Sequence, residues 1–123
     1  MSFTNLGLSS ALLKVLSEKN YTKPYPIQQA AIPAILNGKD LLGIASTGSG
    51  KTAGFVLPLL MNLQRDLVTK NRHVTVLVLV PTRELAVQVQ EVFHTFGSGL
   101  SKPVKSMAVY GGCLLYTSPS PRD

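Results

Sequence analysis

One loop of the chain combines glycines with a lysine and a threonine, which are residue types that bind phosphate groups. Residues 45–52 read A-S-T-G-S-G-K-T. Glycines let successive backbone N–H groups turn toward phosphate oxygens, Lys51 supplies a positive charge for the β and γ phosphates, and the hydroxyl of Thr52 can ligate Mg²⁺. The pattern predicts a nucleotide site with Lys51 and Thr52 as its catalytic pair. Its members are Ala45, Ser46, Thr47, Gly48, Ser49, Gly50, Lys51 and Thr52.

The loop departs from the general phosphate-loop pattern at one position. Ala45 stands where G-x-x-x-x-G-K-[ST] begins with glycine. An ordinary turn rich in glycine and serine is the alternative interpretation. It does not explain why Lys51 and Thr52 open a helical pattern directly after a short apolar run, so the phosphate-binding interpretation is favoured.

Apolar runs typical of buried strands alternate with helical patterns along the chain. The runs 41–45, 74–80 and 104–110 predict strands, and the second reads V-T-V-L-V-L-V, as in parallel strands covered on both faces. Strands that alternate with helices predict an α/β fold with a parallel sheet and helices on both faces. The loops after Ala45 and Val80 then lie at the carboxyl ends of strands, where such sheets bind ligands.

Four helices are expected between and before these strands. Apolar spacing and end signals place them from Ser9 or Ser10 to about Asn20, from Pro26 to Leu36 before Asn37-Gly38, from Gly50 to about Leu67 with a bend at Pro58, and from Leu85 to Gly97. Asn20 tolerates the left-handed conformation that closes the first helix, and Pro33 is expected to kink the second.

Composition limits the compartment and the partners. The 123 residues form one domain, carry a net charge of +6 and have a pI of about 9.7, which suits a polyanion such as nucleic acid, although scattered solvated lysines explain the charge equally well. Cys113 is the single cysteine, so a disulfide within the chain is excluded and a cytoplasmic location is expected. No apolar stretch approaches the roughly 20 residues of a membrane helix, so no membrane association is expected.

Several segments, in order and spacing, resemble motifs of the DEAD-box RNA helicases. The phosphate loop matches the family's A-x-T-G-x-G-K-T, residues 24–28 (P-Y-P-I-Q) resemble its Q motif, residues 81–86 (P-T-R-E-L-A) with Gln88 resemble P-T-R-E-L-A-x-Q, and Gly111-Gly112 resembles its G-G motif. The likeness covers residues 1–112 and is closest to the bacterial RhlE-like type, which opens with S-F-x-x-L-G-L-S.

This resemblance implies a RecA-like, P-loop fold, ATP and Mg²⁺ as cofactors and RNA as a partner. It implies that Gln28 hydrogen-bonds adenine and that Phe3 packs on the base, although a core contact is the alternative for Phe3. The expected contacts with the RNA backbone are Pro81, Thr82, Arg83, Gly111 and Gly112. From the residues alone, Thr82 can equally be a helix cap and Arg83 a solvated side chain. Asn20 replaces the family's usual glycine and Tyr25 its frequent threonine.

The resemblance also indicates what this stretch does not contain. No D-E-A-D string occurs, so we expect the chain alone to be catalytically inactive and to need the remainder of its domain and a second RecA-like domain. Residues 1–29 are interpreted as the Q-motif region, 30–112 as a partial ATP-binding domain and 113–123 as a non-native or disordered tail. The alternatives are an inactive nucleotide- or RNA-binding fragment, or another P-loop NTPase such as a kinase, which leaves the P-T-R-E-L-A segment unexplained.

Overall fold

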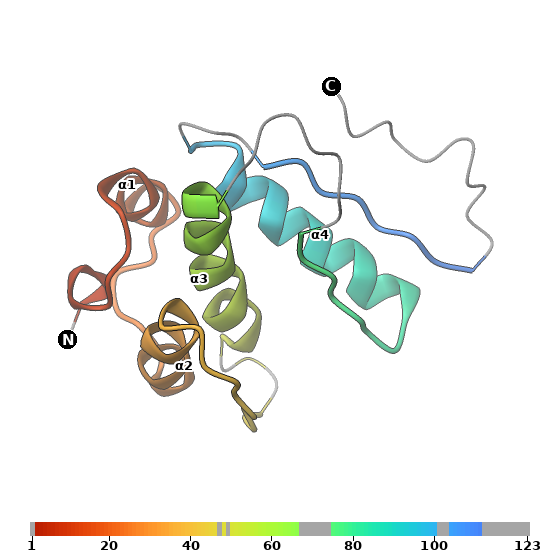
Figure 1. Ribbon diagram of the computed structural model, residues 1–123, viewed down its shortest axis with the longest axis horizontal. Helices are drawn as coiled ribbons and strands as arrows, with labels where there is room; N and C mark the ends of the chain where they lie inside the picture. The colour runs from red at the N-terminus through yellow and green to blue at the C-terminus, as the bar shows by residue number, and fades with distance from the viewer. Residues whose placement is uncertain (1, 47, 49, 67–74, 101–103, 112–123) are drawn as a thin grey trace.

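The computed structural model describes residues 2–46, 48, 50–66, 75–100 and 104–111. Within these ranges the chain forms a short 3-10 helix and a set of α-helices (Figure 1). They are η1 (Phe3–Asn5), α1 (Ser10–Glu18), α2 (Pro26–Leu36), α3 (Lys51–Asp66) and α4 (Arg83–Gly97). No helix among these residues is long and apolar enough to cross a bilayer.

The first helices begin and end where the sequence predicts. The Ser9 hydroxyl accepts a hydrogen bond from the backbone N–H of Leu12 at 3.3 Å and so caps α1. After α1, Asn20 adopts a φ of 65°, the left-handed conformation expected of it. Helix α2 starts with a proline at its first position and is followed by Gly38 at a φ of 74°. The bounds predicted for both helices are therefore confirmed.

The two later helices are confirmed as well. Lys51 is the first residue of α3, so the lysine and threonine of the loop do open a helix. Leu67, expected near its end, lies outside the described residues. Thr82 caps α4, its Oγ1 accepting a hydrogen bond from the backbone N–H of Leu85 at 3.1 Å. The helix predicted from Leu85 thus begins two residues earlier, because the cap is Thr82.

The core is built around α3, which lies between α2 and α4 in Figure 1. Side chains from every helix and from the N-terminal segment meet there and are removed from water. Burial of apolar surface stabilises the fold by roughly 25 cal/mol per Å². The largest fully buried side chains include Leu12, Leu16, Ile32, Val56, Leu57 and Leu60. Packing on α3 therefore holds the loop that precedes it.

The three segments predicted as strands form no strand within the described residues. Residues 41–45, 75–80 and 104–110 show no regular backbone hydrogen bonding there, so the parallel sheet with helices on both faces is not observed. Val74, the first residue of the second predicted strand, lies outside the described residues. Strand geometry depends on a partner backbone that supplies ladder hydrogen bonds, and apolar runs alone do not provide one. Burial on both faces, as predicted for the first two segments, is not observed either, because residues 41–44 are exposed and residues 75–80 alternate between exposed and half-buried.

Exposure alternates along two of these segments as it does on a sheet covered on one face. Val76, Val78 and Val80 pack against the core, whereas Leu77 and Leu79 are 74% and 83% exposed. Residues 104–110 show the same alternation. Large apolar side chains of all three segments are exposed on the described surface: Leu41, Leu42, Ile44, Leu77, Leu79, Met107 and Val109. We call this set the open apolar face.

Candidate nucleotide and nucleic-acid site

The predicted phosphate loop joins residues 41–46 to the start of α3. Gly48 and Gly50 both adopt a φ of 83°, a left-handed conformation that costs glycine less than residues with a Cβ. Lys51 is exposed and Thr52 is half-buried at the helix N-terminus, where N–H groups and the helix dipole favour an anion. The glycines, the cation and the hydroxyl fit the phosphates of a nucleotide. Thr47 and Ser49 lie outside the described residues.

Gln28 joins the start of α2 to this loop. Its side chain is 1% exposed, Oε1 accepts the backbone N–H of Tyr25 at 2.9 Å, and Nε2 donates to the carbonyl of Gly50 at 3.1 Å. The amide oxygen can accept one more hydrogen bond and the amide nitrogen can donate one more. An adenine base can bind these atoms only if the groups that cover Gln28 move, so the contact of Gln28 with adenine stays a prediction.

The same packing explains the glycine at position 50. A Cβ there would overlap Gln28 Nε2 and Tyr25 Cδ2, in addition to the strain of the positive φ. Gly48 has the same φ, but open space surrounds its own Cβ position. The two glycines therefore have different roles. Gly50 allows the Gln28 and Tyr25 side chains to approach the loop closely, whereas Gly48 allows only a turn.

Phe3 lies in the core. It is 4% exposed and its ring is 6.5 Å, centroid to centroid, from that of Tyr21, which in turn meets Phe96 edge-on at 5.4 Å. The structure thus agrees with the core alternative for this conformation, and packing of Phe3 on a base stays a prediction.

Thr52 borders a hollow that the sequence did not indicate. The hollow measures about 540 Å³, and its lining residues are Lys19, Tyr21, Thr52, Gln88, Glu91, Val92, Thr95 and Phe96. It brings Gln88, the last residue of the P-T-R-E-L-A-x-Q segment, to the same recess as the phosphate loop. No single motif contains this juxtaposition, because its members come from α3, α4 and the segment that follows α1.

A second group of predicted residues meets at the N-terminus of α4. Pro81, Thr82 and Arg83 are exposed there, and the guanidinium carbon of Arg83 lies over the ring of Tyr110, 5.8 Å from its centroid. Tyr110 directly precedes Gly111, so the structure brings two of the predicted RNA-contacting segments together. The capping role of Thr82 is confirmed, and its hydroxyl hydrogen remains able to donate to another acceptor. Gly112 lies outside the described residues.

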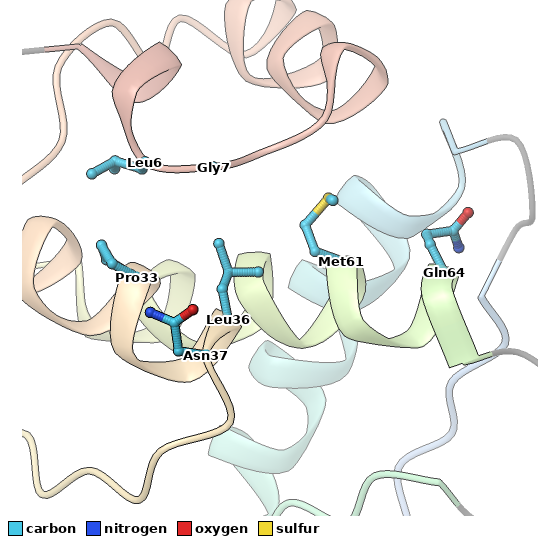
Figure 2. A pocket seen from close by; sticks show the side chains of 7 residues that line it. All are labelled: Leu6, Gly7, Pro33, Leu36, Asn37, Met61 and Gln64. Carbon is cyan, nitrogen blue, oxygen red and sulfur yellow. The ribbon is translucent and has the colours of Figure 1, made fainter.

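A second hollow contains none of the predicted site residues. This apolar cavity of about 500 Å³ lies between the N-terminal segment, the end of α2 and the middle of α3 (Figure 2). Its lining residues are Leu6, Gly7, Pro33, Leu36, Asn37, Met61 and Gln64. In the described part of the chain no group of three or more His, Cys, Asp or Glu side chains is placed to hold a metal ion.

Replacing Gln28 by alanine is expected to lower the free energy of unfolding by about 1–3 kcal/mol, because it removes the part-buried hydrogen bonds with the Tyr25 N–H and the Gly50 carbonyl. The carbonyl keeps its hydrogen bond from the Gly54 N–H, whereas the Tyr25 N–H loses its side-chain acceptor. The matched control is Gln29→Ala, which removes one hydrogen bond from a half-buried side chain to the Pro24 carbonyl and should cost less than about 1.5 kcal/mol. Urea unfolding followed by circular dichroism measures both. An equal loss for the two variants would show that Gln28 does not hold the loop.

Comparison with known proteins connects these features. The family described as DEAD/DEAH box helicase matches residues 25–117. The chain belongs to this family. It is 50% identical over 112 residues to the ATP-dependent RNA helicase DeaD of Buchnera aphidicola (strain Bp) and 50% identical over 111 residues to that of Escherichia coli (strain K12). Those alignments cover 91% and 90% of this chain, but 18% and 17% of the two relatives.

A solved DEAD-box structure shares the fold. The RNA helicase Prp28 from Chaetomium thermophilum, bound to ADP, superposes with a TM-score of 0.82 at 41% identity, over 94% of this chain and 28% of its own. The helices and loop of this chain thus belong to the RecA-like fold of P-loop NTPases found in DEAD-box helicases. Both bacterial relatives carry the name DeaD, and the RhlE-like subtype stays a prediction.

Proposed function

We propose that the chain is the nucleotide- and RNA-binding start of the first RecA-like domain of an ATP-dependent RNA helicase. The complete enzyme would couple ATP hydrolysis to the unwinding of RNA duplexes in the cytoplasm. The observation that carries the proposal is local: Lys51 and Thr52 open α3 immediately after a loop with two left-handed glycines, in a chain of the DEAD-box family.

ATP and Mg²⁺ are the cofactors that this site fits. Backbone N–H groups of residues 45–50 and the Lys51 ammonium would hold the phosphates, and the Thr52 hydroxyl would ligate Mg²⁺ bound to the nucleotide. When bound, the ion neutralises charge that develops on the phosphates. Gln28 and Phe3 would recognise adenine once they are uncovered, since a carboxamide can donate to one edge atom and accept from the exocyclic amine.

RNA is the proposed macromolecular partner. The exposed residues at the start of α4 provide a hydroxyl, a guanidinium and helix N–H groups, all of which bind phosphate oxygens. Gly111 and Gly112 would allow a second stretch of backbone to approach closely. The net charge of +6 favours a polyanion at long range.

Hydrolysis is proposed for the complete enzyme and not for this chain alone. No D-E-A-D carboxylates occur in residues 1–123, and positioning the attacking water requires such groups. The remainder of the first domain and a second RecA-like domain are the proposed partners that supply them. The same proposal includes a parallel sheet and a division of the chain into regions after residues 29 and 112. It also includes the non-native character of residues 113–123.

ADP binding in the presence of Mg²⁺ tests this proposal. At concentrations where light scattering shows a monomer, the chain should bind fluorescent ADP more tightly than fluorescent GDP, and Lys51→Ala should weaken ADP binding about tenfold or more, since it removes charge-assisted hydrogen bonds. Gln28→Ala should abolish the preference for adenine. Equal affinities for ADP and GDP in the unaltered chain, or phosphate release from ATP above the Lys51→Ala level, would contradict the proposal.

A further inference from the structure

Arg83 is one of the predicted RNA contacts, but its pairing with Tyr110 is not among the predictions. Arg83 is the exposed first residue of α4, and the half-buried ring of Tyr110 lies beneath its guanidinium carbon at 5.8 Å. This distance is within the range of a cation–π interaction, about 6 Å to the centroid. The tyrosine therefore attracts a side chain that would otherwise sample several rotamers in water.

An aromatic face restrains an arginine without occupying its hydrogen-bond donors. The guanidinium N–H groups lie in the plane of the group, so contact through its face leaves them able to bind a phosphate in a bidentate manner. The ring also offsets an unfavourable position, because the positive end of the helix dipole repels a cation at the first turn. The interaction thus keeps a phosphate-binding group where a phosphate is favoured.

The segment that carries Tyr110 is docked on α4. Gln90 Nε2 donates to the hydroxyl of Ser106 at 3.1 Å, which docks the segment 104–110 on the helix. At the far end, Gly97 lies against Val104, and a Cβ at residue 97 would come within 3.3 Å of the valine. These contacts place the segment along α4, with Tyr110 near the start of the helix.

We propose that Tyr110 is a positioning residue for RNA binding: its ring holds the Arg83 guanidinium at the N-terminus of α4 so that the arginine meets an RNA phosphate. This inference rests on the proposed RNA-binding function of the same site. It assigns the tyrosine a role through Arg83 and no contact with RNA of its own.

Fluorescence anisotropy with a labelled oligouridylate tests the pair in the full 123-residue chain, at concentrations where the chain is monomeric. Tyr110→Leu and Tyr110→Met should each weaken RNA binding about two- to fivefold, the factor that corresponds to an exposed cation–π interaction, while Tyr110→Phe should bind as the unaltered chain does. Val109→Ala, at an exposed neighbouring position, is the matched control and should change nothing. Using two ring-free variants keeps the test decisive if one of them fails to fold.

The double variants separate positioning from direct contact. Arg83→Ala should lower the salt dependence of binding by about one phosphate contact, and Tyr110→Leu should then have no further effect. A further loss in the Arg83→Ala background, or a loss in Tyr110→Phe equal to that in Tyr110→Leu, would overturn the positioning role. If Arg83→Ala itself leaves RNA binding and its salt dependence unchanged, the proposed RNA site fails. The ADP affinity of every variant is the control that shows whether its fold is intact.

Discussion

Replacing Gly50 by alanine is expected to lower the free energy of unfolding by about 2–4 kcal/mol and to abolish ADP binding. The alanine Cβ would overlap the Gln28 amide and the Tyr25 ring and would also be strained at a φ of 83°. To avoid this overlap, the Gln28 side chain must give up its hydrogen bond to the Gly50 carbonyl, which joins the phosphate loop to α2. Urea unfolding and fluorescent-ADP titration measure the two effects.

Gly48→Ala is the matched control for this prediction. It imposes the same left-handed φ without any overlap, so it should cost only about 1 kcal/mol. The overlap also predicts non-additivity: in a Gln28→Ala background, Gly50→Ala should cost less than it does alone, because one of the two colliding groups is gone. Equal costs for Gly48→Ala and Gly50→Ala would show that the close packing described around residue 50 does not determine the loop.

The second large effect is expected from the open apolar face. The chain should self-associate at micromolar concentration, since extended apolar segments with unpaired backbone recruit other chains and only 15% of the residues are charged. Replacing both Leu77 and Leu79 by lysine should yield a monomer in size-exclusion chromatography with light scattering. These side chains are 74% and 83% exposed, so lysine there buries no charge.

A charge on the opposite face of the same segment provides the control. Val78 packs against the core, so Val78→Lys should unfold the chain and leave its association undiminished. If the unaltered chain elutes as a sharp monomer with one cooperative thermal transition, the open face does not drive association. If the two lysines fail to produce a monomer from an associated chain, another surface is responsible.

The helical part of the fold could be predicted because its signals are local. Ser9 and Thr82 are oxygen-bearing caps in front of apolar spacing, and Pro26 is suited to a first helical position. The phosphate loop was predictable for the same reason, since its glycines, lysine and threonine are contiguous and the helix they open follows at once.

The remainder depended on contacts between distant residues. The runs 75–80 and 104–110 have the composition of strands, but pairing requires a neighbouring backbone that composition does not specify. The hydrogen bond from Gln28 to Gly50 and the contact of Arg83 with Tyr110 join residues far apart in sequence, so no spacing rule identifies them. Core placement of Phe3 was the plainer alternative, and the structure agrees with it.

The packing of α2 on α3 has a consequence for the time course of folding. The two helices are consecutive in sequence and form the most extensive helix pair of the described chain, so their docking closes only the loop of residues 37–50, which favours rapid formation. They also leave the ribosome before the later segments that contribute to the open apolar face. We therefore expect the pair of α2 and α3 to be assembled early during synthesis, and the phosphate loop between them to take its shape before residues 104–110 have been translated.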